Sequence, residues 1–200
     1  MSNLKPYDYE KNYLILLFLA IACLGFTACK DDDKDSGSEA TLNKLQNKQV
    51  SINGEIFDVG SMLGVRPAQG EDVGAYYVDF YPEDENLETD INGKFDIGTP
   101  LVGKTINLTN PVGAVGDNQF QVMITTSLMT LYELNVIEGE AHTIIAGNEN
   151  PISGSGFKEG SFIAKHDSNG FTLQMHGTLN NGQIIAIKAS VPEAAVDYWD

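Results

Sequence analysis

Three histidines are the side chains best suited to metal binding or acid–base catalysis, because an imidazole can do both near neutral pH. They are His142, His166 and His176, and no HExxH or His-x-His motif accompanies them. The alternation of residues around His176 places that side chain on the polar face of a strand. We therefore predict surface or hydrogen-bonded histidines, and neither a metal site nor a cofactor.

The segment Ser153-Gly154-Ser155-Gly156 is the nearest approach to a serine nucleophile. A GxSxG elbow centred on Ser155 needs glycine at position 153, where this chain has serine, and it needs a strand-turn-helix context. The segment therefore predicts a turn. Paired carboxylates could still hydrolyse a glycosidic bond, but most acidic residues here fall in predicted loops. We predict no catalytic residue and no enzyme, with a small carboxylate-based hydrolase as an alternative.

The segment TDINGKFD is rich in oxygen ligands and has a spacing partly like that of a calcium loop. Asp90, Asn92 and Asp96 would supply the oxygens, although the glutamate at the twelfth position of an EF-hand is missing. Glycine directly after asparagine, as at Gly93, also suits a hairpin turn. The sequence leaves calcium binding by the acidic 83–96 loop open and favours the turn.

The densest aromatic cluster lies in the predicted strand 75–81, and a second pair of aromatic residues closes the chain. In a strand, Tyr77 and Tyr81 share one face while Tyr76 shares the other with Phe80, so one set packs into the core. Exposed flat rings bind sugars or proteins well. The competing interpretation, which we favour, is an aromatic core with edge protection. The candidate ligand-binding residues are Tyr76, Tyr77, Tyr81 and Trp199.

Short alternating segments separated by turn residues predict an all-β fold from about residue 48 onward. Asn53-Gly54 between two such segments is a strong hairpin signal. Further strands are predicted within 95–108 and at 119–126, 129–137 and 142–146. No stretch sustains a helical period. We expect an antiparallel β-sandwich or a partly open barrel with about nine to eleven strands and little helix.

The C-terminal third gives the clearest pattern. Strands at 160–166, 171–177 and 183–191 are separated by the turns DSNG and NNG, which predicts a three-stranded meander. Phe171, Leu173 and Met175 alternate with Thr172 and Gln174. One face of this meander should therefore be buried and the other wet.

An apolar segment near the start of the chain indicates export. The uncharged run 13–28 is about 16 residues long, which is typical of a signal peptide and short for a permanent span. The small residues before Cys29 resemble a bacterial lipobox, and this resemblance implies cleavage before Cys29 and its lipidation. The alternative, Cys23, would cut the apolar region to about ten residues. We favour Cys29, which leaves the exported domain without a thiol.

The lipobox and several β segments together resemble the small uncharacterised surface lipoproteins of Bacteroides and related Bacteroidetes. The segments are YYVDFYP, PLVGKTINLT and GSFIAKHDSNGFTLQMHGTLNNGQIIAIKAS. The resemblance implies that Lys30, Asp31, Asp32 and Asp33 form an export signal to the outer face of the outer membrane. It implies a β-rich domain of unknown function and no catalytic residues.

These observations predict three parts: a signal peptide at 1–28, a lipidated flexible acidic tether at 29–47, and one β domain at 48–200. The polar segment 36–47, with Leu42 and Leu45 as its large apolar residues, is either the rest of the tether or a short helical turn. The net charge of −16 disfavours nucleic acid and anionic surfaces as partners. We expect an outer-membrane lipoprotein, bound to the membrane through its lipid and facing the exterior. Its expected role is a non-enzymatic binding or structural module with a glycan or protein partner, and glycan capture is the first alternative.

Overall fold

The structure is a computed structural model that describes residues 37–59, 61–67, 75–81, 91–126, 129–145 and 152–197. For residues 61–67 and 81 it describes the backbone alone. All of these residues belong to one compact unit, 34–200. In the described ranges the chain forms thirteen strands, two short α-helices and two 3₁₀ turns.

Six strands form the first antiparallel sheet, in the order β2-β1-β13-β12-β11-β6. The first described strand of the chain, β1, pairs with the last, β13, and β13 also pairs with β12. The consecutive strands β11, β12 and β13 form the predicted C-terminal meander. The bounds are β1 (Gln49–Ile52), β2 (Glu55–Asp58), β6 (Thr105–Asn107), β11 (Phe157–Asp167), β12 (Gly170–Leu179) and β13 (Ile184–Pro192).

Seven strands form the second sheet, in the order β10-β9-β8-β7-β5-β4-β3. Each described pairing within it is antiparallel. The bounds are β3 (Ser61–Pro67), β4 (Ala75–Tyr81), β5 (Asn92–Gly98), β7 (Phe120–Thr125), β8 (Thr130–Ile137), β9 (Glu140–Ile145) and β10 (Ile152–Ser153).

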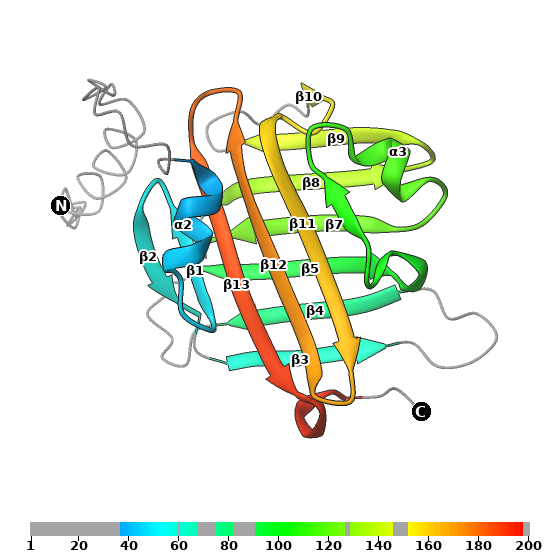
Figure 1. The fold of residues 1–200 in the computed structure, drawn as a ribbon. Helices are drawn as coiled ribbons and strands as arrows, with labels where there is room; N and C mark the ends of the chain where they lie inside the picture. Colours follow the sequence, from blue (N-terminus) through cyan, green and yellow to red (C-terminus); the bar gives the residue numbers. More distant parts are fainter. Residues whose placement is uncertain are drawn as a thin grey trace, which may run out of the picture. The chain divides into compact units, whose positions relative to one another are not determined.

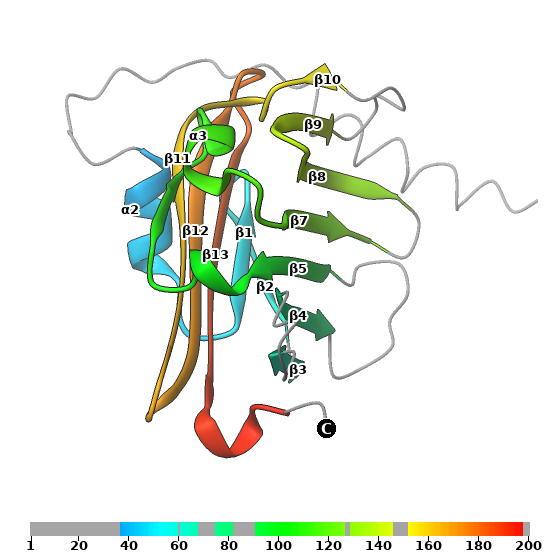
Figure 2. The same cartoon turned by 90° about the vertical axis from the view of Figure 1, so that its right-hand side faces the viewer.

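The two sheets lie face to face, which confirms the all-β sandwich. Figure 2 shows them as two layers, and Figure 1 shows their strands crossing at a large angle. The helix α2 (Ser38–Lys44) lies on the outside of the six-stranded sheet, while α3 (Pro111–Val115) lies at one end of the sandwich. The 3₁₀ turns are η1 (Thr99–Leu101) and η2 (Glu193–Ala195). None of the described helices has the length and hydropathy needed to cross a bilayer.

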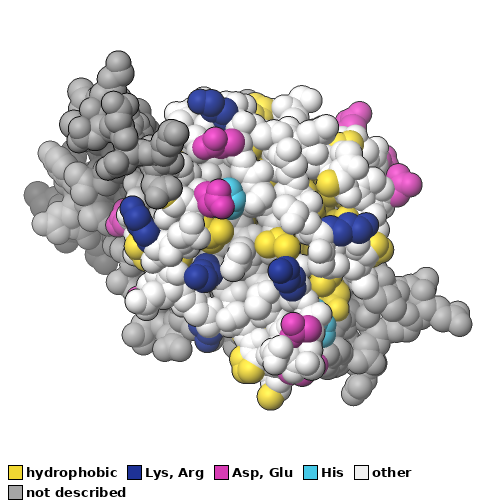
Figure 3. All heavy atoms as spheres, viewed as in Figure 1, with side chains coloured by type: hydrophobic (Ala, Val, Ile, Leu, Met, Phe, Trp, Pro, Cys, Tyr) yellow, Lys and Arg dark blue, Asp and Glu magenta, His cyan; other side chains and the backbone are white. Residues whose placement is uncertain are grey.

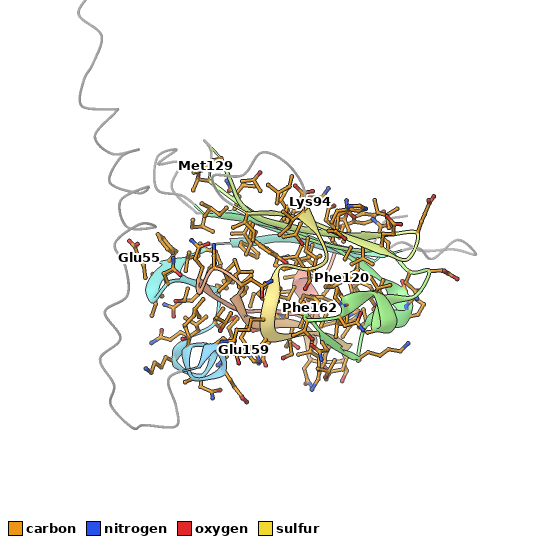
Figure 4. All side chains as sticks on the ribbon, turned by 90° about the horizontal axis from the view of Figure 1, so that it is seen from above. Glu55, Lys94, Phe120, Met129, Glu159 and Phe162 are labelled. Carbon is orange, nitrogen blue, oxygen red and sulfur yellow. The ribbon has the colours of Figure 1, made fainter. Side chains whose placement is uncertain are left out.

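Aromatic side chains from both sheets fill the layer between them. Phe162 of β11 meets Phe120 of β7 edge-on, with 5.1 Å between ring centroids, and stacks on Phe95 of β5 at 6.1 Å. Figure 4 shows Phe120 and Phe162 between the sheets, with Lys94 and Met129 on the far side of the seven-stranded sheet. Because alternate residues of β7 are buried, the opposite residues of this strand form the outer face of the sheet.

The turn predictions hold where glycine or asparagine must adopt a positive φ. Asn53 and Gly54 have φ values of 53° and 87° and join β1 to β2, as the Asn-Gly hairpin signal predicts. Phe171, Leu173 and Met175 are fully buried, whereas Thr172 and Gln174 are exposed. The alternating pattern therefore identified the buried face of β12 correctly.

Two local predictions on the seven-stranded sheet were wrong. The described ranges contain thirteen strands where about nine to eleven were expected, because no strand was predicted at β3 or at the two-residue β10. Asn92-Gly93 is not a turn but the start of β5, in which Gly93 pairs with Phe80 of β4. A Cβ on Gly93 would lie 2.0 Å from the Phe80 ring. This glycine makes room for an aromatic ring on the neighbouring strand rather than for a bend.

The predicted tether ran to residue 47, but its described part is folded. Residues 38–44 form α2, and Leu42 and Leu45 are buried against Ala186 of β13. Residues 36–47 were expected to be either the rest of the tether or a short helical turn, and the structure has the helical turn. Those two leucines are three apart, which places them on one side of a single helical turn.

Candidate functional site

The outer face of the seven-stranded sheet carries a line of polar and aromatic side chains from five neighbouring strands. Each member stands opposite the next in register: Tyr77 with Asp96, Asp96 with Gln121, Gln121 with Asn135, and Asn135 with His142. We call Tyr77, Asp96, Gln121, Asn135 and His142 the polar row. Strands lie about 4.8 Å apart, so the row is about 19 Å long.

The side chains of the polar row differ in their exposure to water. Tyr77, Gln121 and Asn135 are half-buried and His142 is exposed, while Asp96 is only 5% exposed. Sheet faces that simply meet water carry exposed charges, and a buried carboxylate near the middle of such a face is unusual. The row is therefore a partly buried polar surface.

Asp96 is the most unusual member of the row. Its Oδ2 accepts a hydrogen bond of 3.2 Å from Nε2 of Gln119 and lies 3.8 Å from Nζ of Lys94. Its Oδ1 is buried and has no hydrogen-bond partner in the part of the chain that the structure describes. A buried acceptor without a partner costs about 1–3 kcal/mol. Asp96 thus retains an unused acceptor on a surface made of hydrogen-bonding groups.

An open hollow of about 160 Å³ lies beside the polar row on the same face. It is lined by Asn92, Gly93 and Lys94 of β5 and by Met123 and Thr125 of β7. The Lys94 side chain is 43% exposed and reaches both the hollow and Asp96. On the same face, Nε2 of Gln121 donates to Oε1 of Glu133 at 3.2 Å. The face thus offers an ammonium, an amide, a hydroxyl and carboxylates close together.

Neither described helix lies on this face, whereas α2 covers part of the opposite outer face. There His176 is held between two hydroxyls, with Ser38 Oγ 3.0 Å from Nδ1 and Ser161 Oγ 2.9 Å from Nε2. Nζ of Lys188 donates to the carbonyl oxygen of Leu45 at 3.2 Å. The sequence placed His176 on a wet face. It does lie on the outer face, but α2 half-buries it.

Tyr76 is not part of a surface platform with Tyr77, which corrects that part of the candidate set. The two side chains point to opposite sides of β4, and Tyr76 stacks on Phe171 with 5.6 Å between centroids. Oη of Tyr76 lies 3.0 Å from Nδ1 of His166, and Nε2 of His166 lies 2.8 Å from Oε2 of Glu193. The chain Tyr76–His166–Glu193 joins β4 of one sheet to β11 and η2 next to the other.

The chemistry of this second cluster argues against a tyrosine nucleophile. Burial, and then the negative charge of Glu193, raise the pKa of Tyr76. A raised pKa keeps the phenol neutral and weakly nucleophilic. The phenol of Tyr76 can donate to Nδ1 of His166 while Nε2–H of His166 donates to Glu193, so each contact can have one donor and one acceptor. The cluster is a polar contact between the sheets at one end of the sandwich.

The remaining sequence candidates either make structural contacts or lie outside the described residues. Ser155 is buried in the turn after β10, and its Oγ accepts from the backbone N–H of Phe157. The described residues contain no group of three or more metal-ligating side chains placed to hold an ion. Cys29, the export signal Lys30, Asp31, Asp32 and Asp33, as well as Asp90 and Trp199, lie outside the described residues, as does the side chain of Tyr81.

Sequence reasoning named three members of the polar row, among them His142 as one of the histidines, but it did not place them on one face. Tyr77 was a candidate, and Asp96 was considered only as part of a loop. Gln121 and Asn135 were not singled out, although each stands between buried residues in its strand. That alternation could have placed them on an outer face. The strand order that brings them into line could not be obtained from the same signal.

Comparison with known proteins places the chain in no family. It is similar to a protein of Prochlorococcus marinus named a probable cytosol aminopeptidase, with 26% identity over 94% of this chain. The chain spans 42% of the length of that protein. No family model matches the chain, and no solved structure matches it.

Proposed function

We propose that this chain is a lipid-anchored, non-enzymatic binding module of the outer membrane that contacts its ligand through the polar row. The observation that carries the proposal is the row itself: five strands align hydrogen-bonding side chains on a face that neither described helix covers. The buried carboxylate of Asp96 near the middle of that face supports the proposal, because sheet faces that meet water seldom bury a charged side chain.

The anchor part of the proposal rests on the sequence around Cys29. The apolar run before this cysteine and the acidic run after it are typical of exported lipoproteins. The acidic run cannot bury apolar surface, so it suits a spacer between a lipid and a folded domain. On this proposal the domain faces the exterior and is held to the membrane by its lipid alone.

The aminopeptidase name of the partial relative does not enter the proposal. The match covers less than half of that protein, and an identity of 26% leaves room for a change of activity. The non-enzymatic part of the proposal predicts that the full-length chain releases no amino acid from leucine p-nitroanilide, with or without added zinc or manganese. Release of p-nitroaniline above that of a mock preparation would contradict it.

Metabolic labelling with palmitate and protease digestion of intact cells test the anchor and the exposure. We expect the label to be retained in Cys23→Ala and lost in Cys29→Ala, since only Cys29 would carry the lipid. Proteinase K should remove the domain from intact cells that express the unchanged protein. Loss of label in Cys23→Ala but not in Cys29→Ala would mean that Cys23 carries the lipid. Protection of the domain until lysis would place it inside the envelope.

A further inference from the structure

We propose that the polar row is a binding site for a neutral saccharide chain that lies across strands β4, β5, β7, β8 and β9. This inference deepens the proposed function and rests on its use of the same face. The proposed site is a line of carboxylate and amide side chains with one aromatic ring, Tyr77, at its end. It differs from the aromatic platform that the sequence suggested.

The side chains of the row match the hydrogen bonds that sugar hydroxyls make. A hydroxyl both donates and accepts, so it pairs with a carboxylate, an amide or an ammonium group. Asp96 and Glu133 accept, Lys94 donates, and Gln121 can do both. Tyr77 adds a flat apolar surface for the C–H face of a ring. Few ligands other than carbohydrates present so many hydroxyls along a chain.

The carboxylate of Asp96 gives the site its centre. Each carboxylate oxygen can accept more than one hydrogen bond, so Oδ2 has a second acceptor position besides the one that Gln119 uses. A ligand hydroxyl can therefore donate to Oδ2 while Gln119 keeps its bond. The nearby hollow, with Lys94 and Thr125 in its lining, has room for a neighbouring substituent.

The position of the row disfavours an extended peptide as the occupant. β5, β7 and β8 are each paired on both sides, so their backbone groups are already used. Peptides gain affinity on sheets mainly by pairing with a free edge, which this site does not offer. Polyanions are disfavoured as well, because the chain carries a net charge of −16. A neutral ligand rich in hydroxyls remains.

The test measures calorimetric binding of neutral hexasaccharides of glucose, mannose and xylose to the full-length protein in detergent micelles. We expect at least one of the three to bind, and Asp96→Asn and Gln121→Ala each to weaken that binding about tenfold. Gln174→Ala is the matched control, because Gln174 is exposed in β12 on the outer face of the other sheet. It should change the affinity by less than about twofold.

Circular dichroism and thermal unfolding establish that each variant is folded, and Asn135→Ala replaces any variant that is not. Binding of none of the three saccharides would overturn the inference, as would equal loss in Gln174→Ala. Tighter binding of a polyuronate hexasaccharide would also overturn it, since the site would then prefer an anion. Failure here leaves palmitate labelling and protease exposure unaffected, so the two proposals fail separately.

Discussion

The two outer faces of the sandwich differ in the side chains that they carry and in whether a helix covers them. On the six-stranded sheet, α2 places Leu42 and Leu45 over Ala186, and its hydroxyl at Ser38 holds His176. On the seven-stranded sheet, the polar row stands in register across five strands, and the carboxylate of Asp96 is buried within it. The first face is covered by a helix, whereas neither described helix covers the hydrogen-bonding groups of the second.

The difference separates stability from function. Burial of leucine side chains under a helix lowers the free energy of the folded state, whereas an unpaired buried oxygen raises it. Buried side-chain oxygens without a described partner occur in both sheets, at Asp96 in one and at Ser51, opposite Ala186, in the other, so the contrast rests on the whole polar row. Substitutions on the α2 side should therefore change the free energy of unfolding, and substitutions in the polar row should change binding instead.

The largest effect is expected in the core that both faces share. Phe162→Ala removes the ring that meets Phe120 and Phe95 and should cost about 3–5 kcal/mol in urea unfolding. Ile56→Ala, at a site that is 49% exposed, is the control and should change the value by less than about 0.5 kcal/mol. Equal losses in the two variants would show that the layer between the sheets is loosely packed.

The second-largest effect compares the free energy of unfolding of one variant from each outer face. Leu45→Ala should lower the free energy of unfolding by about 2–3 kcal/mol, because Leu45 is only 3% exposed beneath α2. Gln121→Ala should change it by less than about 0.5 kcal/mol, because its one described hydrogen bond is to a surface carboxylate. The comparison fails if the glutamine variant loses as much stability as the leucine variant.

A smaller effect tests whether the inner side of the seven-stranded sheet, rather than its outer face, stabilises that sheet. Oη of Tyr132 donates to the carbonyl oxygen of Ser155 at 3.0 Å. Tyr132→Phe should cost about 1–3 kcal/mol because that carbonyl is left unpaired. The cost is measured by urea unfolding at pH 7, where a change below about 0.5 kcal/mol would assign the stability of this sheet to other contacts.

The same tyrosine gives a pH dependence with a defined sign. Burial raises the pKa of Tyr132 well above 10.0, so the folded chain keeps a proton that the unfolded chain loses. The resulting stability is fully present below pH 10 and decreases as the pH rises above it. Urea midpoints measured from pH 7 to 11 should fall less steeply in Tyr132→Phe. An unchanged slope would contradict the assignment.

The smallest effect concerns the polar contact under α2. Ser38→Ala removes the hydroxyl beside Nδ1 of His176 and should cost about 1 kcal/mol. Thr172→Ala, exposed on the same sheet face, serves as the control in thermal unfolding. A null result for Ser38→Ala would mean that the two leucines alone hold the helix in place.

Local patterns predicted the hairpins and the buried face of the meander because these features depend on neighbouring residues. Asn53-Gly54 adopts positive φ values wherever the rest of the chain lies, and the alternation in β12 follows from strand geometry alone. The same signals could not give the strand order of the seven-stranded sheet. That order depends on pairings between distant segments.

The polar row was hidden from the sequence for the same reason. Its members come from five strands that begin up to 65 residues apart in the chain, from β4 at 75 to β9 at 140. The aromatic cluster lies within one short segment of the sequence, so Tyr76 and Tyr77 were predicted together as ligand-binding residues. Only the strand register shows that one of them contacts Phe171 and that the other belongs to the row.

The pairing of β1 with β13 also constrains when this chain can fold. β13 lies between β1 and β12, so the six-stranded sheet lacks a central strand until residues 184–192 are available. Such distant contacts make folding slow, because a long loop must close before any of its contacts form. While the chain is synthesised from its N-terminus, the six-stranded sheet would stay incomplete until its last strand had been made. On the proposed export of this chain, that delay favours the unfolded state that crosses a membrane.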